Sequence, residues 1–192
     1  MTTRPDTAAA AARDDAGAVQ RSLRAPEQFA DVFERHFADV HHYAARRLGE
    51  AAADDIAAET FLTAFRRRDR YESDRGPVRA WLFGIAANLI GRHRRAEVRA
   101  LRTWARAGTD PVSGCHSDQV ADRLSGGLGP GLAGVLARLS AADREVLLLV
   151  AWAELSYDEV ATALRIPPGT VASRLNRARR KVRAALQTLD EE

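Results

Sequence analysis

Residues 156–183, SYDEVATALRIPPGTVASRLNRARRKVR, have the pattern of two helices joined by a tight turn. Ser156 can cap the first helix, and Glu159, three residues later, can complete a capping box with it. The two prolines of the turn cannot continue that helix, so the helix must end there. Thr170 follows the turn and is a candidate cap for the second helix. Together these signals predict a helix-turn-helix.

The second of these predicted helices combines an apolar spine with a cationic outer surface. Its apolar residues recur every three or four positions and so share one face: Val171, Leu175, Ala178, Val182 and Leu186. The rest of the helix carries these cations and no acid before Asp190: Arg174, Arg177, Arg179, Arg180, Lys181 and Arg183. Such a helix suits the DNA major groove, where its N-terminal part contacts base edges and later arginines contact phosphates. A helical hairpin with a solvated charged face is the alternative, but the coincidence of capping box, turn, spine and unbalanced charge favours DNA binding.

The same residues resemble a known family. The string LSYDEVATALRIPPGTVASRLNRARRKVRAAL is similar to the −35-binding domain of bacterial sigma-70 factors, most of all the extracytoplasmic-function (ECF) group. The resemblance begins near residue 132 and includes the apolar helix that Ser140 is predicted to cap. By position it implies contacts with the −35 element at Ala172, Ser173, Asn176 and Arg177. Further candidates for −35 DNA contact are Thr170 and, at phosphates, Arg174, Arg179 and Arg180. Ala172 and Asn176 replace larger or basic residues common in the family, so the preferred −35 sequence does not follow.

The composition limits the classes of protein. The chain has 192 residues, 46% of them hydrophobic, which allows one or two small packed domains. Its single cysteine, Cys115, excludes an internal disulfide and a thiolate metal cluster. No apolar run approaches the ~20 residues that span a membrane, and the N-terminus does not have the pattern of a secretion signal. We therefore expect a cytoplasmic protein that needs no membrane, cofactor or metal.

The pattern along the chain predicts an all-α fold of two small helical domains joined by a flexible linker, the second containing the helix-turn-helix. The expected divisions are a disordered tail over 1–26, a first domain over 27–107, a linker over 108–130, a second domain over 131–187 and an acidic end over 188–192. The linker is rich in Gly, Ser and Pro. It also allows the two domains to pack on each other.

The first domain is expected to begin with helices over 27–48 and 53–68. The acids near the start of the second helix can form a docking surface for a protein partner, but composition alone favours acids that interact with the helix dipole and lie on a solvated face. The segment ADDIAAETFLTAF resembles the ECF helix that binds the clamp helices of the polymerase β′ subunit. The resemblance implies polymerase-binding roles at Asp54, Asp55, Glu59, Thr60 and Phe61. Ala58 departs from the family pattern, in which glutamine is usual.

A polar loop over 69–77 and a long helix over 78–99 complete the first domain. Between 92 and 106 arginines far outnumber acids, which favours a phosphate-binding surface over an ordinary solvated face. The segment VRAWLFGIAANLIGRHRRAE also resembles the sigma segment that opens the −10 element, where a base is flipped into a pocket of the preceding loop. The candidate −10 residues are Tyr71, Ser73, Asn88, Arg92 and Arg95.

These observations predict an ECF-type sigma factor that binds core RNA polymerase through the β′ clamp helices and recognises promoter DNA, with no catalytic residues of its own. An anti-sigma factor is a further candidate partner, and the free protein is expected to cover part of its DNA-binding surface. One alternative is a stand-alone helix-turn-helix regulator that binds operator DNA. A helical enzyme is the other, but the sequence has neither a nucleophile–base pattern nor a metal-ligand spacing.

Overall fold

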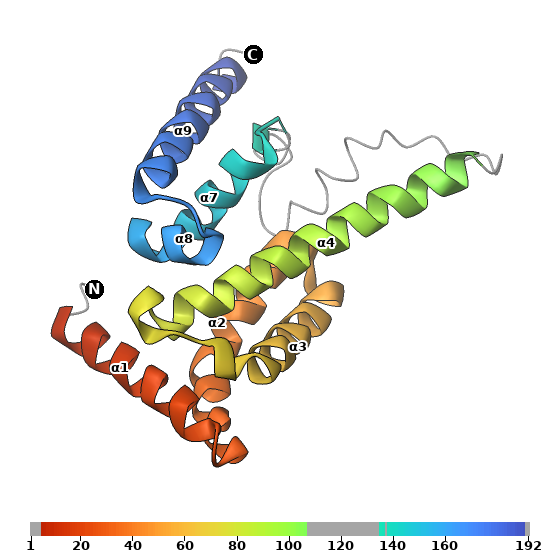
Figure 1. Ribbon diagram of the computed structural model, residues 1–192. Coiled ribbons are helices and arrows are strands. Elements are labelled where there is room, and N and C mark those ends of the chain that lie inside the picture. The colour runs from red at the N-terminus through yellow and green to blue at the C-terminus, as the bar shows by residue number, and fades with distance from the viewer. Residues whose placement is uncertain (1–4, 107–134, 137, 191–192) are drawn as a thin grey trace.

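The computed structural model describes residues 5–106, 135–136 and 138–190, and Figure 1 shows their arrangement. Every regular element in these residues is helical, which confirms the predicted all-α fold. Helices α1 to α4 form a first domain and helices α7 to α9 a second. The predicted linker over 108–130, with Cys115 in it, lies outside the described residues.

The N-terminal segment departs from the prediction. Residues 1–26 were expected to form a disordered tail, but Pro5–Ser22 form helix α1. The helix packs on the first domain, with Val19 fully buried. The carboxylate of Asp15 is also buried, and its Oδ2 lies 2.7 Å from Nε2 of His36. An alanine-rich segment has high helix propensity, but its stabilising partner lies 21 residues away and leaves no local pattern.

The first domain is built from three further α-helices joined by short turns. The elements after α1 are η1 (Pro26–Phe29), α2 (Ala30–Leu48), α3 (Glu50–Arg66), η2 (Arg68–Arg70), η3 (Ser73–Arg75) and α4 (Val78–Arg106). Gly49 separates α2 from α3 with a φ of 84°, a conformation that favours glycine. The predicted helices are present, although α3 begins before residue 53 and α4 continues past residue 99.

The second domain contains the helix-turn-helix. Its helices are α7 (Ala141–Ala151), α8 (Tyr157–Leu164) and α9 (Pro168–Asp190). Ser140 caps α7 by accepting a hydrogen bond from a backbone N–H of the first turn. Ser156 and Glu159 form both hydrogen bonds of the capping box on α8, as predicted. Because α9 includes residues up to Asp190, the predicted acidic end over 188–192 is partly helical.

The turn between α8 and α9 differs from the prediction at Thr170. Arg165 ends α8 in the left-handed conformation, with φ of 53° and ψ of 48°. Pro168 then begins α9, because a proline fits the first helical position, where the backbone needs no N–H donor. Thr170 therefore lies inside the first turn of α9 and is not its cap, and its N–H donates to Pro167 O at 2.9 Å.

The two domains pack on each other where α8 crosses α4, so that α8 lies between α4 and α9 (Figure 1). Gly84 of α4 faces the backbone of Ala163, and a Cβ added at Gly84 would lie 2.6 Å from the Ala163 carbonyl oxygen. The hydroxyl of Thr162 donates to the Arg75 carbonyl at 3.1 Å. Only a residue without a side chain allows this close approach of two helices.

A buried ion pair joins the domains at a second point. Arg47 of α2, with a side chain only 2% exposed, donates from Nη1 and Nη2 to the carboxylate of Glu145 on α7, at 2.9 and 2.8 Å. The Tyr43 hydroxyl donates to the same carboxylate at 3.0 Å. Burial pushes the pKa of Glu145 up, but the hydrogen bonds and charge of Arg47 outweigh this effect and hold the pKa below its ordinary value. We call this packing of the two domains the closed arrangement.

Candidate nucleic-acid interface

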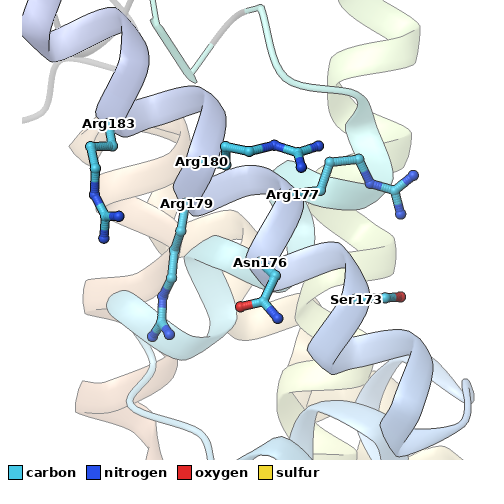
Figure 2. Close-up of a pocket in the computed structure, with 6 residues that line it drawn as sticks. All are labelled: Ser173, Asn176, Arg177, Arg179, Arg180 and Arg183. Atoms are coloured by element: carbon cyan, nitrogen blue, oxygen red, sulfur yellow. The ribbon is translucent and has the colours of Figure 1, made fainter.

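The cationic face of α9 is exposed. Val171, Leu175 and Ala178 are buried against α7 and α8, which directs the polar side chains of α9 away from the domain. Figure 2 shows the shallow depression that these polar side chains form. The residues that line it are Ser173, Asn176, Arg177, Arg179, Arg180 and Arg183. Every side chain that lines it is neutral or positively charged, which suits a phosphate backbone.

The predicted −35 residues fall into two groups. Ser173, Asn176, Arg177 and Arg180 are exposed and lie together in the depression. Thr170, Ala172 and Arg174 are half-buried and do not line it. Arg183 lines the depression but was not among the candidates. Helical spacing is the signal that could have identified Arg183. Ser173, Asn176, Arg180 and Arg183 are separated by three, four and three residues, which puts them on one face of α9.

Two cations of α9 contact the other helices of the domain. Arg177 lies with its Nε 3.4 Å from Oδ1 of Asp143 on α7, where the carboxylate is almost fully buried. An Arg179 terminal nitrogen donates to the Tyr157 hydroxyl at 3.5 Å, from the start of α8. The positions of these two guanidinium groups are therefore partly set by the protein itself.

The predicted −10 residues are not all on one surface. Asn88, Arg92 and Arg95 are exposed along α4, and the amide of Asn88 donates to the Gly84 carbonyl at 2.8 Å. Ser73 is exposed in the loop before α4.

Tyr71 departs from this group, because its side chain turns into the first domain. It is only 6% exposed, its ring lies 5.1 Å from that of Trp81, and its hydroxyl donates to Gly76 O at 3.0 Å. Burial raises the pKa of Tyr71 to about 12. The structure thus gives Tyr71 the position of an anchor for the loop and does not bring its ring to the surface with Ser73.

The predicted polymerase-binding residues are divided in the same way. Asp54, Asp55 and Glu59 are exposed on α3, and Asp54 Oδ1 lies 2.9 Å from Nε2 of His41. Thr60 and Phe61 are buried, and the Thr60 hydroxyl donates to a backbone carbonyl one turn earlier. Thr60 and Phe61 therefore hold α3 in the first domain, while the three acids face solvent.

Two exposed apolar side chains of the first domain were not among the sequence candidates. Phe33 of α2 and Leu62 of α3 are each 41% exposed. The Phe33 ring lies 5.0 Å from that of Phe61, which connects this apolar patch to the helix that carries the acids. Apolar periodicity does not distinguish Phe33 from the buried residues of α2, and only the packing of α2 on α3 shows that its side chain is exposed.

The described residues contain no group of three or more acidic, histidine or cysteine side chains that is arranged to hold a metal ion. Among the same residues, no helix combines the length and apolar character needed to cross a membrane.

Comparisons with known proteins agree on one family. The family model for sigma-70 region 2 matches residues 32–100, and the model for sigma-70, region 4 matches residues 132–182. The ECF RNA polymerase sigma factor SigL of Mycobacterium tuberculosis is 36% identical over 160 residues, covering 82% of this chain and 88% of SigL. The RNA polymerase sigma factor CnrH of Cupriavidus metallidurans is 33% identical, covering 77% of this chain and 81% of CnrH.

Solved structures of similar fold were determined as complexes. The structure of CnrH with the cytosolic domain of CnrY matches with a TM-score of 0.63 and 25% identity, covering 91% of this chain and 97% of CnrH. The sigma factor RpoE of Bartonella quintana, solved with the anti-sigma factor NepR, has the same fold, with a TM-score of 0.60 and 22% identity over 84% of this chain and 98% of RpoE.

Proposed function

The chain belongs to the ECF group of RNA polymerase sigma factors, and we propose how its surfaces divide the work of transcription initiation. As a member of this group it binds core RNA polymerase and directs promoter recognition, while the polymerase makes the RNA. The observation that carries the proposal is the separation of exposed charge. Acids gather on α3 of the first domain, and cations gather on α9 of the second.

We assign polymerase binding to the exposed acids of α3: Asp54, Asp55 and Glu59. The exposed apolar side chains Phe33 and Leu62 extend this surface. An apolar centre beside charged groups is the usual composition of a protein–protein interface. The β′ clamp helices are the proposed partner, through cations that complement the acids. Thr60 and Phe61 support this surface from inside the domain.

We assign promoter contacts to two helices. Asn88, Arg92 and Arg95 of α4 and Ser73 of the preceding loop are proposed to contact the −10 element. The exposed residues of the α9 depression are proposed to contact the −35 element, with Ser173, Asn176 and Arg177 near base edges and the later arginines at phosphates. We propose that the chain is cytoplasmic, because RNA polymerase transcribes there.

We further propose that the closed arrangement belongs to the free chain and opens when polymerase binds. The α9 depression stays exposed in the closed arrangement, so the −35 surface is not the part that is covered. The contact of α8 with α4 instead covers the helix face beside Asn88 and holds the two DNA-binding helices close together. Promoter elements separated by more than one helical turn, about 34 Å, require the domains to move apart.

An anti-sigma factor is the proposed inhibitor of this opening. Both similar structures named above were solved with a protein partner, CnrY for CnrH and the anti-sigma factor NepR for RpoE. Such a partner can act on this chain by covering the acids of α3 or by stabilising the contact between α4 and α8.

Co-purification with core RNA polymerase tests the assignment directly. The tagged full chain is mixed with purified core enzyme, and the ratio of the chain to β′ is measured after size-exclusion chromatography. We expect a stoichiometric complex that forms without DNA. A stand-alone regulator would elute separately from the polymerase, and that result would overturn the proposal.

A further inference from the structure

The contact between Asp143 and Arg177 joins the start of α7 to the cationic face of α9. Asp143 lies in the first turn of α7, where its backbone N–H donates to the Ser140 hydroxyl at 3.1 Å. Its side chain is 5% exposed and that of Arg177 is 48% exposed. The ion pair therefore has one end fixed inside the domain and the other at the surface.

The geometry of the pair leaves the outer part of the guanidinium free. Oδ1 of Asp143 approaches Nε of Arg177 at 3.4 Å. Among the contacts of the described residues, none involves Nη1 or Nη2 of Arg177. Figure 2 shows Arg177 extending to one side of α9, while Arg179 and Arg183 extend to the other. A guanidinium held at Nε keeps its two terminal nitrogens available as a planar pair of donors.

We propose that Asp143 is a positioning residue that sets the base specificity of Arg177 without touching DNA; this inference rests on the proposed contact of α9 with the −35 element. Guanine presents two acceptors, O6 and N7, in the major groove, and a bidentate arginine matches them. The Asp143 carboxylate, 3.4 Å from Nε, restricts the guanidinium before DNA arrives, so less side-chain entropy is lost on binding. Guanine is therefore the base that the pair is suited to recognise.

The charge of Asp143 has a second effect. An unpaired arginine is attracted to any phosphate, and phosphate contacts strengthen binding to all sequences alike. The nearby carboxylate offsets part of the positive charge of Arg177 and weakens this general attraction. Removing the carboxylate should thus lower the preference for one base pair while leaving general DNA affinity equal or higher.

If Asp143 had a purely structural role, its removal would have different effects on stability and DNA binding. A buried carboxylate needs a charged or hydrogen-bonding partner, so the pair could serve only to hold α7 against α9. Loss of Asp143 would then destabilise the second domain and weaken binding to every sequence by the same factor. The two roles are distinguished by whether removal of Asp143 changes discrimination at one base pair alone or weakens binding to every sequence.

The experiment uses holoenzyme formed from the full chain and core RNA polymerase. A library of promoters with randomised −35 regions first defines the preferred sequence, and binding is then measured on that promoter and on each single-base-pair substitution. The variants are Asp143→Asn, which keeps the shape, Asp143→Ala, Arg177→Ala and the double Asp143→Ala/Arg177→Ala. Ser140→Ala is the matched control, because it weakens the start of α7 but retains the carboxylate.

We expect wild-type discrimination of about 5- to 150-fold at one guanine position, the range for a bidentate contact. Both Asp143 variants should reduce discrimination at that position to about the Arg177→Ala level, with other positions unchanged. In the Arg177→Ala background, Asp143→Ala should cause no further loss of discrimination. Ser140→Ala should lower thermal stability and leave discrimination intact.

Three results would overturn the inference. A uniform loss at all positions in Asp143→Asn would show a structural role, as would an equal loss of discrimination in the presence and absence of Arg177. If wild-type holoenzyme had no base preference at any −35 position, the proposed role of α9 would fail, and the inference with it. That outcome is distinct, because it appears before any variant is compared.

Discussion

Replacing Gly84 with alanine should open the closed arrangement. The added Cβ would lie 2.6 Å from the carbonyl oxygen of Ala163 and 3.2 Å from its Cα, so backbone must move and no side-chain rotation can relieve the clash. Overpacking of this kind costs about 1–3 kcal/mol. Because opening removes the clash, that cost becomes a shift of about 5- to 150-fold toward the open form.

Gly91→Ala is the matched control on the same helix. Its Cβ would meet only the terminal nitrogens of the flexible Arg95 side chain, at 3.4 and 3.9 Å. Both substitutions favour the helical state of α4 by about 0.5–1 kcal/mol, because alanine has the higher helix propensity. A difference between the two variants therefore reports the contact with α8 and not the stability of α4.

Small-angle scattering and polymerase affinity measure the outcome. A compact chain of this length has a radius of gyration of about 16 Å. If the domains of a variant separate, its radius of gyration must be larger than that of the wild type. If only the open form binds polymerase, the apparent affinity should rise in proportion to the open fraction in Gly84→Ala and stay unchanged in Gly91→Ala. Identical scattering profiles and affinities for the two variants would refute the reasoning.

Further expectations concern charge and capping. Reversing Asp54 and Asp55 to arginine should abolish binding to core polymerase with unchanged circular dichroism, and retained transcription by this variant would remove the docking assignment. Arg177→Ala should weaken binding to the preferred −35 sequence by about 1–3 kcal/mol in a holoenzyme titration, and unchanged affinity would mean that α9 is placed differently on DNA. The lowered pKa of Glu145 means that its charge stabilises the closed arrangement above the ordinary pKa of 4.5, and this contribution is lost as pH falls through the lowered value. Scattering across this pH range should show domain separation in acid, and Glu145→Gln should lack this pH-dependent component. Ser156→Ala should lower stability by about 1 kcal/mol in thermal denaturation, because it removes the hydroxyl that accepts the hydrogen bond from the Glu159 N–H; an unchanged melting temperature would contradict this.

The helix-turn-helix could be predicted because its signals are local. Ser156 and Glu159 lie three residues apart, and the prolines of the turn act within the chain itself. The apolar spine of α9 likewise follows from spacing, and its burial at Val171 and Leu175 agrees with it. Thr170 failed as a cap because Pro168 already occupies the first position of α9, a competition that the residue type of Thr170 does not reveal.

The features that sequence reasoning missed depend on distant partners. Helix α1 is held by Asp15 and His36, which lie 21 residues apart, so its own composition suggested a mobile tail. The ion pair between Arg47 and Glu145 spans 98 residues and joins the two domains. Tyr71 is an aromatic residue in a polar loop, which suits a base-contacting role. Only its packing against the first domain shows that its side chain is buried. Such contacts form when helices pack, and no local periodicity encodes them.

Transcription from a reconstituted system tests the central claim most directly. Purified core RNA polymerase and the full chain are incubated with a library of duplexes in which two elements and their spacing vary, and run-off transcripts are sequenced. We expect transcripts that depend on the chain and start at a fixed distance downstream of the selected pair of elements. If the chain binds the same duplexes but the core enzyme makes no specific transcript, its charged faces do not divide the work between polymerase and promoter.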